Sequence, residues 1–249
     1  MRTLGWRLAP IFFLSVRQFI GGKAVLAVAG LASLPMLFSL IYRINPDIDR
    51  PRRYLDDIFT QFMLPSVLPL AVLVLATGAF GDELEDRTLP YLVLKPISRF
   101  RIVVEKLLAA VAISAPIVGA FTFLSWLFIF WDDAGANTDM LWGMLAAVAV
   151  GTLVYTAVFE FFSLFISRAI LASIIYSLVW ETVLGRFIPG LRYASIRHLV
   201  SSVYVSVIDD RRIALTGSFG TAGAVTAALI ITAVAVALGT WRLRKLNIE

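Results

Sequence analysis

The 249-residue chain contains no cysteine and only one histidine, His198. The missing cysteines exclude disulfides and thiolate metal sites. A single histidine argues against a metal centre built on several histidines and against a Ser-His-Asp triad. Charge is scarce as well, because Asp, Glu, Lys and Arg make up 16% of the chain, where a soluble domain carries about 25%.

Several motifs that carry chemistry are also missing. The sequence has no GxxxxGK[ST], and GGKA at 21–24 lacks both the first glycine spacing and the Ser or Thr. Without that loop the chain has no cradle for phosphate and cannot hydrolyse ATP alone. HExxH and GxSxG are absent too, and they mark metalloproteases and serine hydrolases. We therefore expect no catalytic residue, no metal site and no cofactor bound by this chain.

Apolar sequence is what the chain has in abundance. Five uncharged runs of 19 to 28 residues cover 24–42, 58–81, 107–131, 140–159 and 213–240. About 20 apolar residues are needed to cross the hydrocarbon core of a bilayer as a helix. A sixth span is expected near 169–188, although Glu181 interrupts it, and the alternative there is a re-entrant or interfacial helix.

The fold class predicted is an all-α integral membrane protein with six transmembrane helices. The expected spans are 24–42, 60–81, 107–130, 140–166, 169–188 and 217–240, all within one transmembrane domain over 1–249. Residues 3–20 mix aromatic side chains with arginine and are too short to span, which indicates a helix in the headgroup plane. The connection at 189–212 is long, so short amphipathic helices or a small extracytoplasmic cap are expected there.

Lysine and arginine divide unequally between alternate connections of these spans. The set that includes both chain termini holds 13 of them, and the other set holds 9. Cytoplasmic loops carry the excess of Lys and Arg. We therefore expect a multi-pass protein of the inner (plasma) membrane, with both termini in the cytoplasm.

Two glutamates, Glu160 and Glu181, lie inside the expected spans. Ionisable residues in hydrocarbon are costly and usually face the bundle interior or a wet cavity. One interpretation is a substrate path or proton relay that includes Glu160, Glu181 and the neighbouring Trp180. The other is a structural polar contact, which we favour for Glu160, while the deeper Glu181 leaves both interpretations open.

The densest run of charge joins the second and third expected spans. The 25 residues from Asp82 to Lys106 contain five acidic and five basic side chains. Its acidic start makes it a poor ligand for anionic lipid. Pro96 disfavours helix at Lys95, and Ser98 can cap a new helix that runs into the third span. We expect a polar corner followed by a short helix along the membrane surface, which a soluble partner could grip.

The stretch GDELEDRTLPYLVLKPISRFRIVVEKLLA at 81–109 resembles permeases of the ABC-2 type transporter family. The likeness lies in the acidic run that ends in RT, in the PISR corner and in the EK helix. YSLVWETVLGRFIPGLRYASIRHLV at 176–200 resembles the six-span, single-domain branch of that family, which often has an aromatic-Glu pair late in the fifth span.

This resemblance implies the membrane subunit of an ABC transporter, which exports its substrate. Two copies would form a homodimer, or one copy a pseudo-symmetric heterodimer with a second permease, with spans two and five lining the path. Two separate ATPase subunits would bind ATP and Mg and dock from the cytoplasm. The implied partners are those ATPases, the second permease and the lipid bilayer. An extracytoplasmic accessory protein is a possible further partner, and nucleic acid is not expected as one.

The family's coupling helix, carried onto this chain, covers roughly residues 98–105. The residues it would place at the ATPase are Ser98, Arg99, Phe100, Arg101, Ile102 and Glu105. The cytoplasmic polar patch beside them is Asp82, Glu83, Glu85, Asp86 and Arg87.

A second class of function stays open, namely an ion-coupled secondary carrier or channel with Glu160 and Glu181 as ion sites. It would work without an ATPase and depend steeply on pH. An intramembrane enzyme is disfavoured because clusters of nucleophiles, carboxylates or metal ligands are not visible in the sequence. The cargo itself is not readable, and low charge in the spans leans only slightly toward a hydrophobic or amphipathic one.

Overall fold

The computed structural model describes residues 9–44, 50–85, 97–166, 168–184, 195–208 and 219–245. Every regular element in these ranges is helical. The elements are α2 (Pro10–Gly21), α3 (Ala24–Ile44), α4 (Pro51–Asp57), η1 (Ile58–Val67), α5 (Leu68–Glu85), α7 (Arg99–Ile129), η2 (Ala134–Asn137), α8 (Thr138–Phe165), α9 (Ala169–Ile175), η3 (Tyr176–Leu184), α11 (Ile196–Ile208) and α12 (Thr221–Lys245).

Within the described residues, five helices are long and apolar enough to cross a membrane. They are Ala24–Ile44, Pro51–Gly81, Arg99–Ile129, Thr138–Phe165 and Thr221–Lys245. The shortest has 21 residues and is therefore about 31 Å long, which matches the hydrocarbon core. This confirms the expected all-α membrane architecture.

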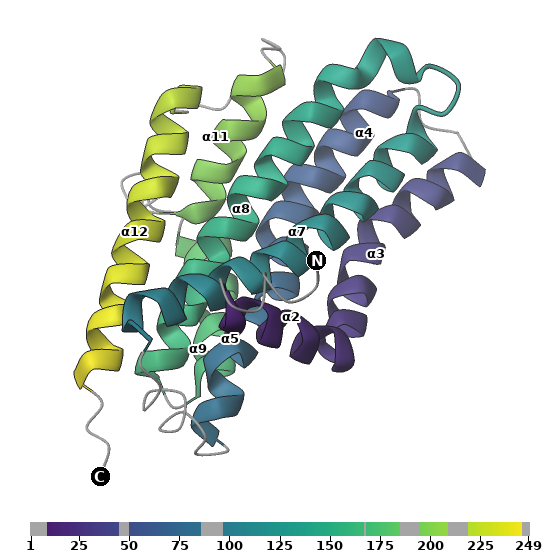
Figure 1. The fold of residues 1–249 in the computed structure, drawn as a ribbon. Helices are drawn as coiled ribbons and strands as arrows, with labels where there is room; N and C mark the ends of the chain where they lie inside the picture. Colours follow the sequence, from purple (N-terminus) through teal and green to yellow (C-terminus); the bar gives the residue numbers. More distant parts are fainter. Residues whose placement is uncertain are drawn as a thin grey trace.

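Burial is uneven among the helices of the bundle, whose arrangement Figure 1 shows. The most apolar windows of Pro51–Gly81 and of α8 are 61% and 56% buried, whereas those of α3 and α12 are 22% and 28% buried. α3 and α12 lie at opposite flanks and expose large apolar side chains such as Ile41 and Leu229. Lipid tails are as apolar as these side chains, so the flanking helices can face the bilayer without a penalty.

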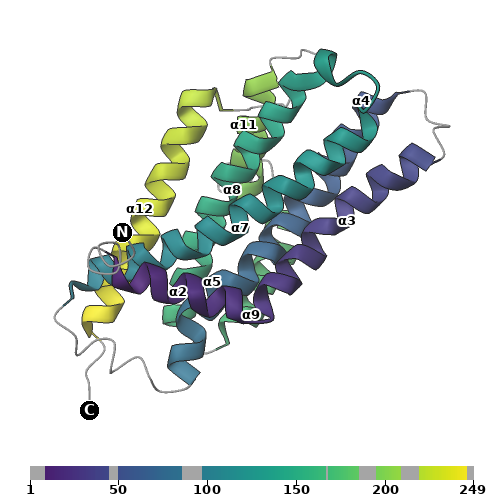
Figure 2. The same ribbon diagram turned by 45° about the vertical axis from the view of Figure 1, so that its right-hand side comes forward.

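Helix α2 lies crosswise at one end of the bundle, beside the first turns of α7 (Figures 1 and 2). It begins at Pro10, which suits the first helical position because proline has no N–H to leave unpaired there. Ile11, Ser15 and Phe19 form a buried stripe, while Ile20 is exposed. Residues 3–8 of the expected interfacial helix lie outside the described residues.

The helix α4–η1–α5 is continuous, and its middle is π-helical. Pro65 lies in that π segment and has no N–H. With the i to i+5 spacing of a π-helix, the carbonyl that loses its donor is that of Thr60. Nη2 of Arg197 donates to this oxygen at 3.0 Å. A side chain from α11 thus replaces the hydrogen bond that the proline removes, which makes the proline tolerable in a span.

Ion pairs join two connections at the end of the bundle where α3 and α7 finish. Arg43 pairs with Asp132, and Arg52 pairs with Asp139. The hydrogen bond from Arg43 lowers the pKa of the Asp132 carboxyl below its ordinary value. The bases of 43–57 and the acids of 132–139 therefore lie together, as expected for connections on the same side of a membrane. The Arg43–Asp132 pair is exposed and therefore contributes little stability, whereas the Arg52–Asp139 pair is partly buried.

The region after α8 holds a helix in the predicted fifth span and another in the predicted loop. The span was predicted over 169–188, where α9 and η3 form a helix from Ala169 to Leu184, and residues 185–194 lie outside the described residues. The loop predicted over 189–212 contains α11, which packs inside the bundle along α8 (Figure 1). Of the two structures expected there, the short amphipathic helix is the one found.

Glycines in α8 allow α11 to approach closely. A Cβ atom on Gly143 would lie 2.8 Å from Cγ1 of Ile208 and 3.2 Å from the carbonyl oxygen of Tyr204. A Cβ atom on Gly151 would lie 3.3 Å from the Cγ atoms of Val200. Because the numbering rises along α8 as it falls along α11, the two helices run antiparallel. The sequence pattern missed this packing because an amphipathic 13-residue helix is too short to be recognised as membrane-embedded.

Gly143→Ala should destabilise the protein by about 1–3 kcal/mol, since the new methyl group overlaps both a side chain and a backbone carbonyl. Thermal unfolding in detergent measures the effect. Gly119→Ala is the matched control, because its Cβ would meet only Leu145 at an ordinary 3.8 Å. Equal melting temperatures for the two variants would contradict the placement of α11 against α8.

Candidate functional site

The polar corner before the third span ends in a capped helix start. α7 begins at Arg99, and Oγ of Ser98 accepts a hydrogen bond from the backbone N–H of Arg101 at 3.4 Å. This confirms the predicted cap. α7 then continues to Ile129 over 31 residues, about 46 Å. The expected short helix is therefore the first two turns of a spanning helix and not a separate element.

Glu105 joins these first turns to α2. Its Oε2 accepts hydrogen bonds from the backbone N–H groups of Ile11 and Phe12, at 2.9 and 3.0 Å. Arg101 donates to the other carboxylate oxygen. No side chain of α2's own N-cap residue satisfies these donors. A carboxylate at a helix N-terminus is stabilised by the free N–H groups and by the helix dipole, so Glu105 serves as the cap of α2.

This geometry corrects the predicted surface for a partner. Ile102 and Glu105 were both expected at that surface, yet both side chains are buried inside the chain. Phe100 is 55% exposed, and Ser98 is exposed beside it. Arg101 is partly exposed although it is tied to Glu105. The outward face of the α7 start thus consists of residues 98–101.

Lys106 joins the start of α7 to the end of α5. Its ammonium group is buried, donates to the backbone carbonyl of Ala79 and lies 2.7 Å from Oε1 of Glu83. It also sits 4.7 Å from the ring centroid of Phe80, a distance at which cation–π attraction operates. Removing one partner of such a pair leaves an uncompensated charge, which makes the link hard to break.

The predicted polar patch is therefore described only in part. Glu83 faces inward to Lys106. Asp82 and Glu85 belong to the last turns of α5. Asp86 and Arg87 lie outside the described residues.

Glu181 lies buried in the π-helical segment η3 and accepts four hydrogen bonds. Tyr176 donates its hydroxyl at 2.8 Å, and Ser195 donates its hydroxyl to the other oxygen. The backbone N–H groups of Ile196 and Arg197 donate at 2.9 and 3.0 Å. Glu181 thus caps α11 as Glu105 caps α2, and the structure favours the structural interpretation that the sequence left open.

Trp180, the other aromatic part of this motif, is half-buried and stacks on Tyr176 with ring centroids 6.4 Å apart. Arg197 connects the same junction to η1 through its bond to Thr60. The two π-helical segments, in the second span and after α9, therefore meet around one buried carboxylate. Such segments occur often at functional sites.

Glu160 behaves differently. Its side chain is 1% exposed, and neither carboxylate oxygen has a hydrogen-bond partner among the described residues. Burying an unpaired charge is very costly, so a group in this position is held neutral or compensated. The polar contact that we favoured for Glu160 from the sequence is not found in the described part of the chain. Of the two span glutamates, only Glu181 has hydrogen-bond partners for its carboxylate among the described residues.

The sequence matches a family model described as "ABC-2 family transporter protein" over residues 22–187. The chain belongs to the ABC-2 transporter family. The matched range begins just before α3 and ends just beyond η3, so it includes the polar corner, Glu160 and Glu181. A search of curated proteins finds no match to the sequence. The protein is therefore an ABC transporter permease and an integral membrane protein.

The sequence did not reveal three residues that build the site of this ABC-2 permease. Lys106, Ser195 and Arg197 all pair with elements far away in the chain. One signal was available for Lys106, because Glu105 and Lys106 are the last charges before a long uncharged run. Charges at that depth must find partners, but the sequence does not say which.

Glu181→Gln should destabilise the permease by about 1–3 kcal/mol, because the amide NH2 would face a donor where the carboxylate accepts one. Glu160→Gln should leave stability unchanged or raise it, since it removes a carboxylate without a partner among the described residues. Thermal unfolding of both variants at pH 7 gives the comparison. A larger loss for Glu160→Gln than for Glu181→Gln would contradict these assignments.

Glu105→Ala should loosen the first turn of α2 while leaving α7 folded. Loss of a cap costs about 1–2 kcal/mol, which corresponds to about 5- to 30-fold faster opening. Hydrogen exchange at the amides of Ile11 and Phe12 measures it. The amides of Ala110 to Ile113, inside α7, serve as the internal control. Unchanged exchange at both capped amides would show that Glu105 does not hold α2.

Proposed function

We propose that this ABC-2 permease is the transmembrane subunit of an exporter driven by ATP hydrolysis in separate ATPase subunits. The family membership supports the permease role. The sequence has no phosphate-binding loop of its own, so ATP and Mg would bind to the partner. Two ATPase copies would serve a pair of permeases, either a homodimer or a pseudo-symmetric heterodimer.

The ATPase would contact the outward face of the α7 start, at Ser98, Arg99, Phe100 and Arg101. Charged and apolar side chains alternate there, and the exposed Phe100 offers an anchor of the kind that dominates protein interfaces. In this proposal the contact side faces the cytoplasm. The excess of Lys and Arg on the set of connections that includes this corner supports that orientation, with both termini inside and the protein in the inner (plasma) membrane.

The observation that carries the proposal is the anchoring of α7. The helix runs unbroken from Arg99 into the membrane, so a displacement of its first turns is not absorbed by a loop. Glu105 transmits the displacement to α2, and Lys106 transmits it to the end of α5 through Glu83. Packed elements with direct polar links move as rigid bodies, as in shear and hinge transitions.

The movement of α5 would then reach the centre of the bundle. α5 is continuous with η1, which precedes it in the chain, and the carbonyl of Thr60 in η1 accepts a hydrogen bond from Arg197. The backbone of Arg197 is in turn bonded to Glu181 in η3. A displacement of residues 98–101 would thus move the second, third and fifth spans together. A tilt of these helices would then change which side of the membrane has access to a path between the subunits.

The alternative, an ion-coupled carrier or channel, is supported only by Glu160. Glu181 already accepts four hydrogen bonds, so an ion would have to displace the cap of α11. The unpartnered Glu160 could bind a proton or cation without that cost. Transport by the permease in vesicles without any ATPase, with a steep dependence on pH, would favour this alternative.

Phe100→Ala should weaken co-purification of the ATPase by more than about fivefold, since truncating an anchor residue costs more than 1 kcal/mol. The measurement uses the ATPase subunit encoded nearest to this permease, with both proteins in detergent. Trp131→Ala is the matched control, because Trp131 is also a large exposed aromatic residue, 59% exposed, and lies at the opposite end of the bundle.

Arg101→Glu is not a suitable test, because it would repel Glu105 and release α2 as well. Equal ATPase recovery with Phe100→Ala and Trp131→Ala would refute the contact at 98–101. No recovery with the unaltered permease would refute the partnership itself.

A further inference from the structure

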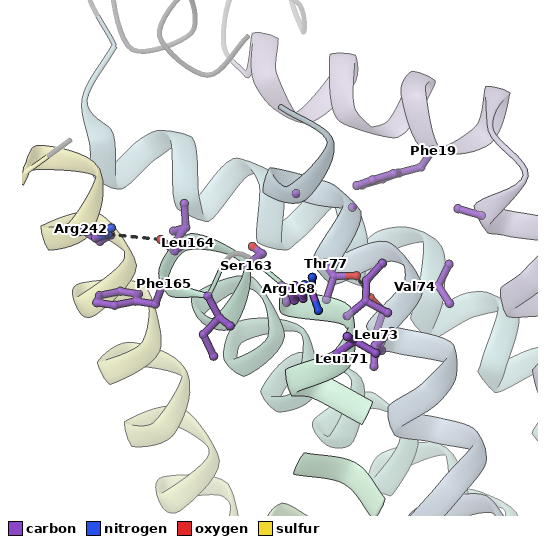
Figure 3. Close-up of a pocket in the computed structure, with 16 residues that line it drawn as sticks. Phe19, Leu73, Val74, Thr77, Ser163, Leu164, Phe165, Arg168, Leu171 and Arg242 are labelled. Atoms are coloured by element: carbon purple, nitrogen blue, oxygen red, sulfur yellow. Dashed lines mark hydrogen bonds between the residues drawn. The ribbon is translucent and has the colours of Figure 1, made fainter. Parts of the chain in front are cut away.

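A pocket of about 940 Å³ opens at the end of the bundle where α5, α8 and α12 finish and α9 begins. Figure 3 shows Arg242, on α12, at one side of this pocket and Arg168 nearer its middle. The volume lies within the range of small-molecule sites. The walls of the pocket on α5 and α9 belong to the second and fifth spans, but the polar links at Glu105, Lys106 and Arg197 do not line it.

The walls of the pocket are mostly apolar. They include Leu73 and Val74 of α5, Leu171 of α9 and Phe19 of α2. The lining on α5 runs from Leu73 to Gly81, which is about 12 Å along the helix axis. With the end of the bundle at the level of the headgroups, as a spanning α5 requires, a pocket of this depth would extend into the hydrocarbon.

The charged residues described in the lining, Arg168 and Arg242, are both basic. The Nε of Arg242 donates a hydrogen bond to the carbonyl oxygen of Leu164 at 3.4 Å, and its guanidinium group lies 5.5 Å from the ring centroid of Phe165. The side chain of Arg168 makes no hydrogen bond or ion pair with any residue in the described part of the chain. Guanidinium groups bind phosphate oxygens in a paired geometry.

We propose that this pocket binds an anionic phospholipid from the adjoining leaflet. The phosphate lies at Arg168, the acyl chains run along Leu73, Val74 and Leu171, and Arg242 adds positive charge at the other side of the pocket. Basic pockets between transmembrane helices suit anionic headgroups. Free phosphate offers the same anionic chemistry, but it would leave the apolar wall uncovered, so the depth of the pocket favours the lipid.

The test measures lipid binding to the full-length permease, purified in detergent, by native mass spectrometry with added phosphatidylglycerol. Arg168→Gln with Arg242→Gln should weaken binding roughly 10- to 30-fold, since each cation near a membrane surface contributes about 1 kcal/mol. Arg17→Gln with Lys23→Gln is the matched control, because it removes two exposed bases near the same end that do not line the pocket.

A second variant tests the pocket without changing its charge. Gly81 lines it, and a Cβ atom there would meet nothing within 4 Å. Gly81→Leu should therefore fill the pocket, leave the fold intact and weaken phosphatidylglycerol binding as strongly as the double arginine variant. Thermal unfolding of each variant without added lipid shows that the protein is folded.

Two further probes identify the ligand. Phosphatidylcholine, which has the same chains and no net charge, should bind at least about tenfold more weakly, and inorganic phosphate at millimolar concentration should not displace the lipid. Displacement by inorganic phosphate would make this a free-anion site and overturn the lipid assignment. Unchanged binding in the arginine or Gly81 variants would overturn the site. Neither result depends on an ATPase, so the proposed function is tested separately.

Discussion

The bundle depends on satisfying backbone N–H and carbonyl groups that have no water to bond to. Each such group left unpaired in hydrocarbon costs several kcal/mol. Two buried glutamates perform this task at the starts of short helices. Glu105 accepts from two N–H groups of α2, and Glu181 accepts from two of α11. Both short helices are thereby fixed to other elements, α2 to α7 and α11 to η3.

The same constraint explains the second span. Pro65 removes a donor, and the carbonyl of Thr60 is satisfied instead by Arg197. The backbone N–H of Arg197 also donates to Glu181. One residue therefore bonds the carbonyl freed by the proline with its side chain and the capping carboxylate with its backbone. The unusual π-helical stretches η1 and η3 meet at this point. Irregular backbone is tolerated at membrane depth only where protein surrounds it, which is the situation here.

In the mechanism that we propose for this ABC-2 permease, the residues that transmit movement from the ATPase also stabilise the bundle. Residues 98–101 at the start of α7 face outward. In the next turn, the side chains of Glu105 and Lys106 are buried and bond to α2 and α5. A partner would therefore bind a short surface that is rigidly connected to α2 and α5. Glu160 differs, because it is buried without a hydrogen-bond partner among the described residues and interacts with Lys106 only through its charge.

The sequence by itself determined the membrane class, because uncharged runs of about 20 residues have no other stable environment. It also determined the cap at Ser98, since capping depends on local residue type. Only the tertiary structure decided that Glu105 and Ile102 face inward, that Glu181 is a cap, and that α11 enters the bundle. The physical reason is that these assignments depend on partners 15 to 94 residues away, and a short polar or amphipathic segment carries no local mark of the partner it will find.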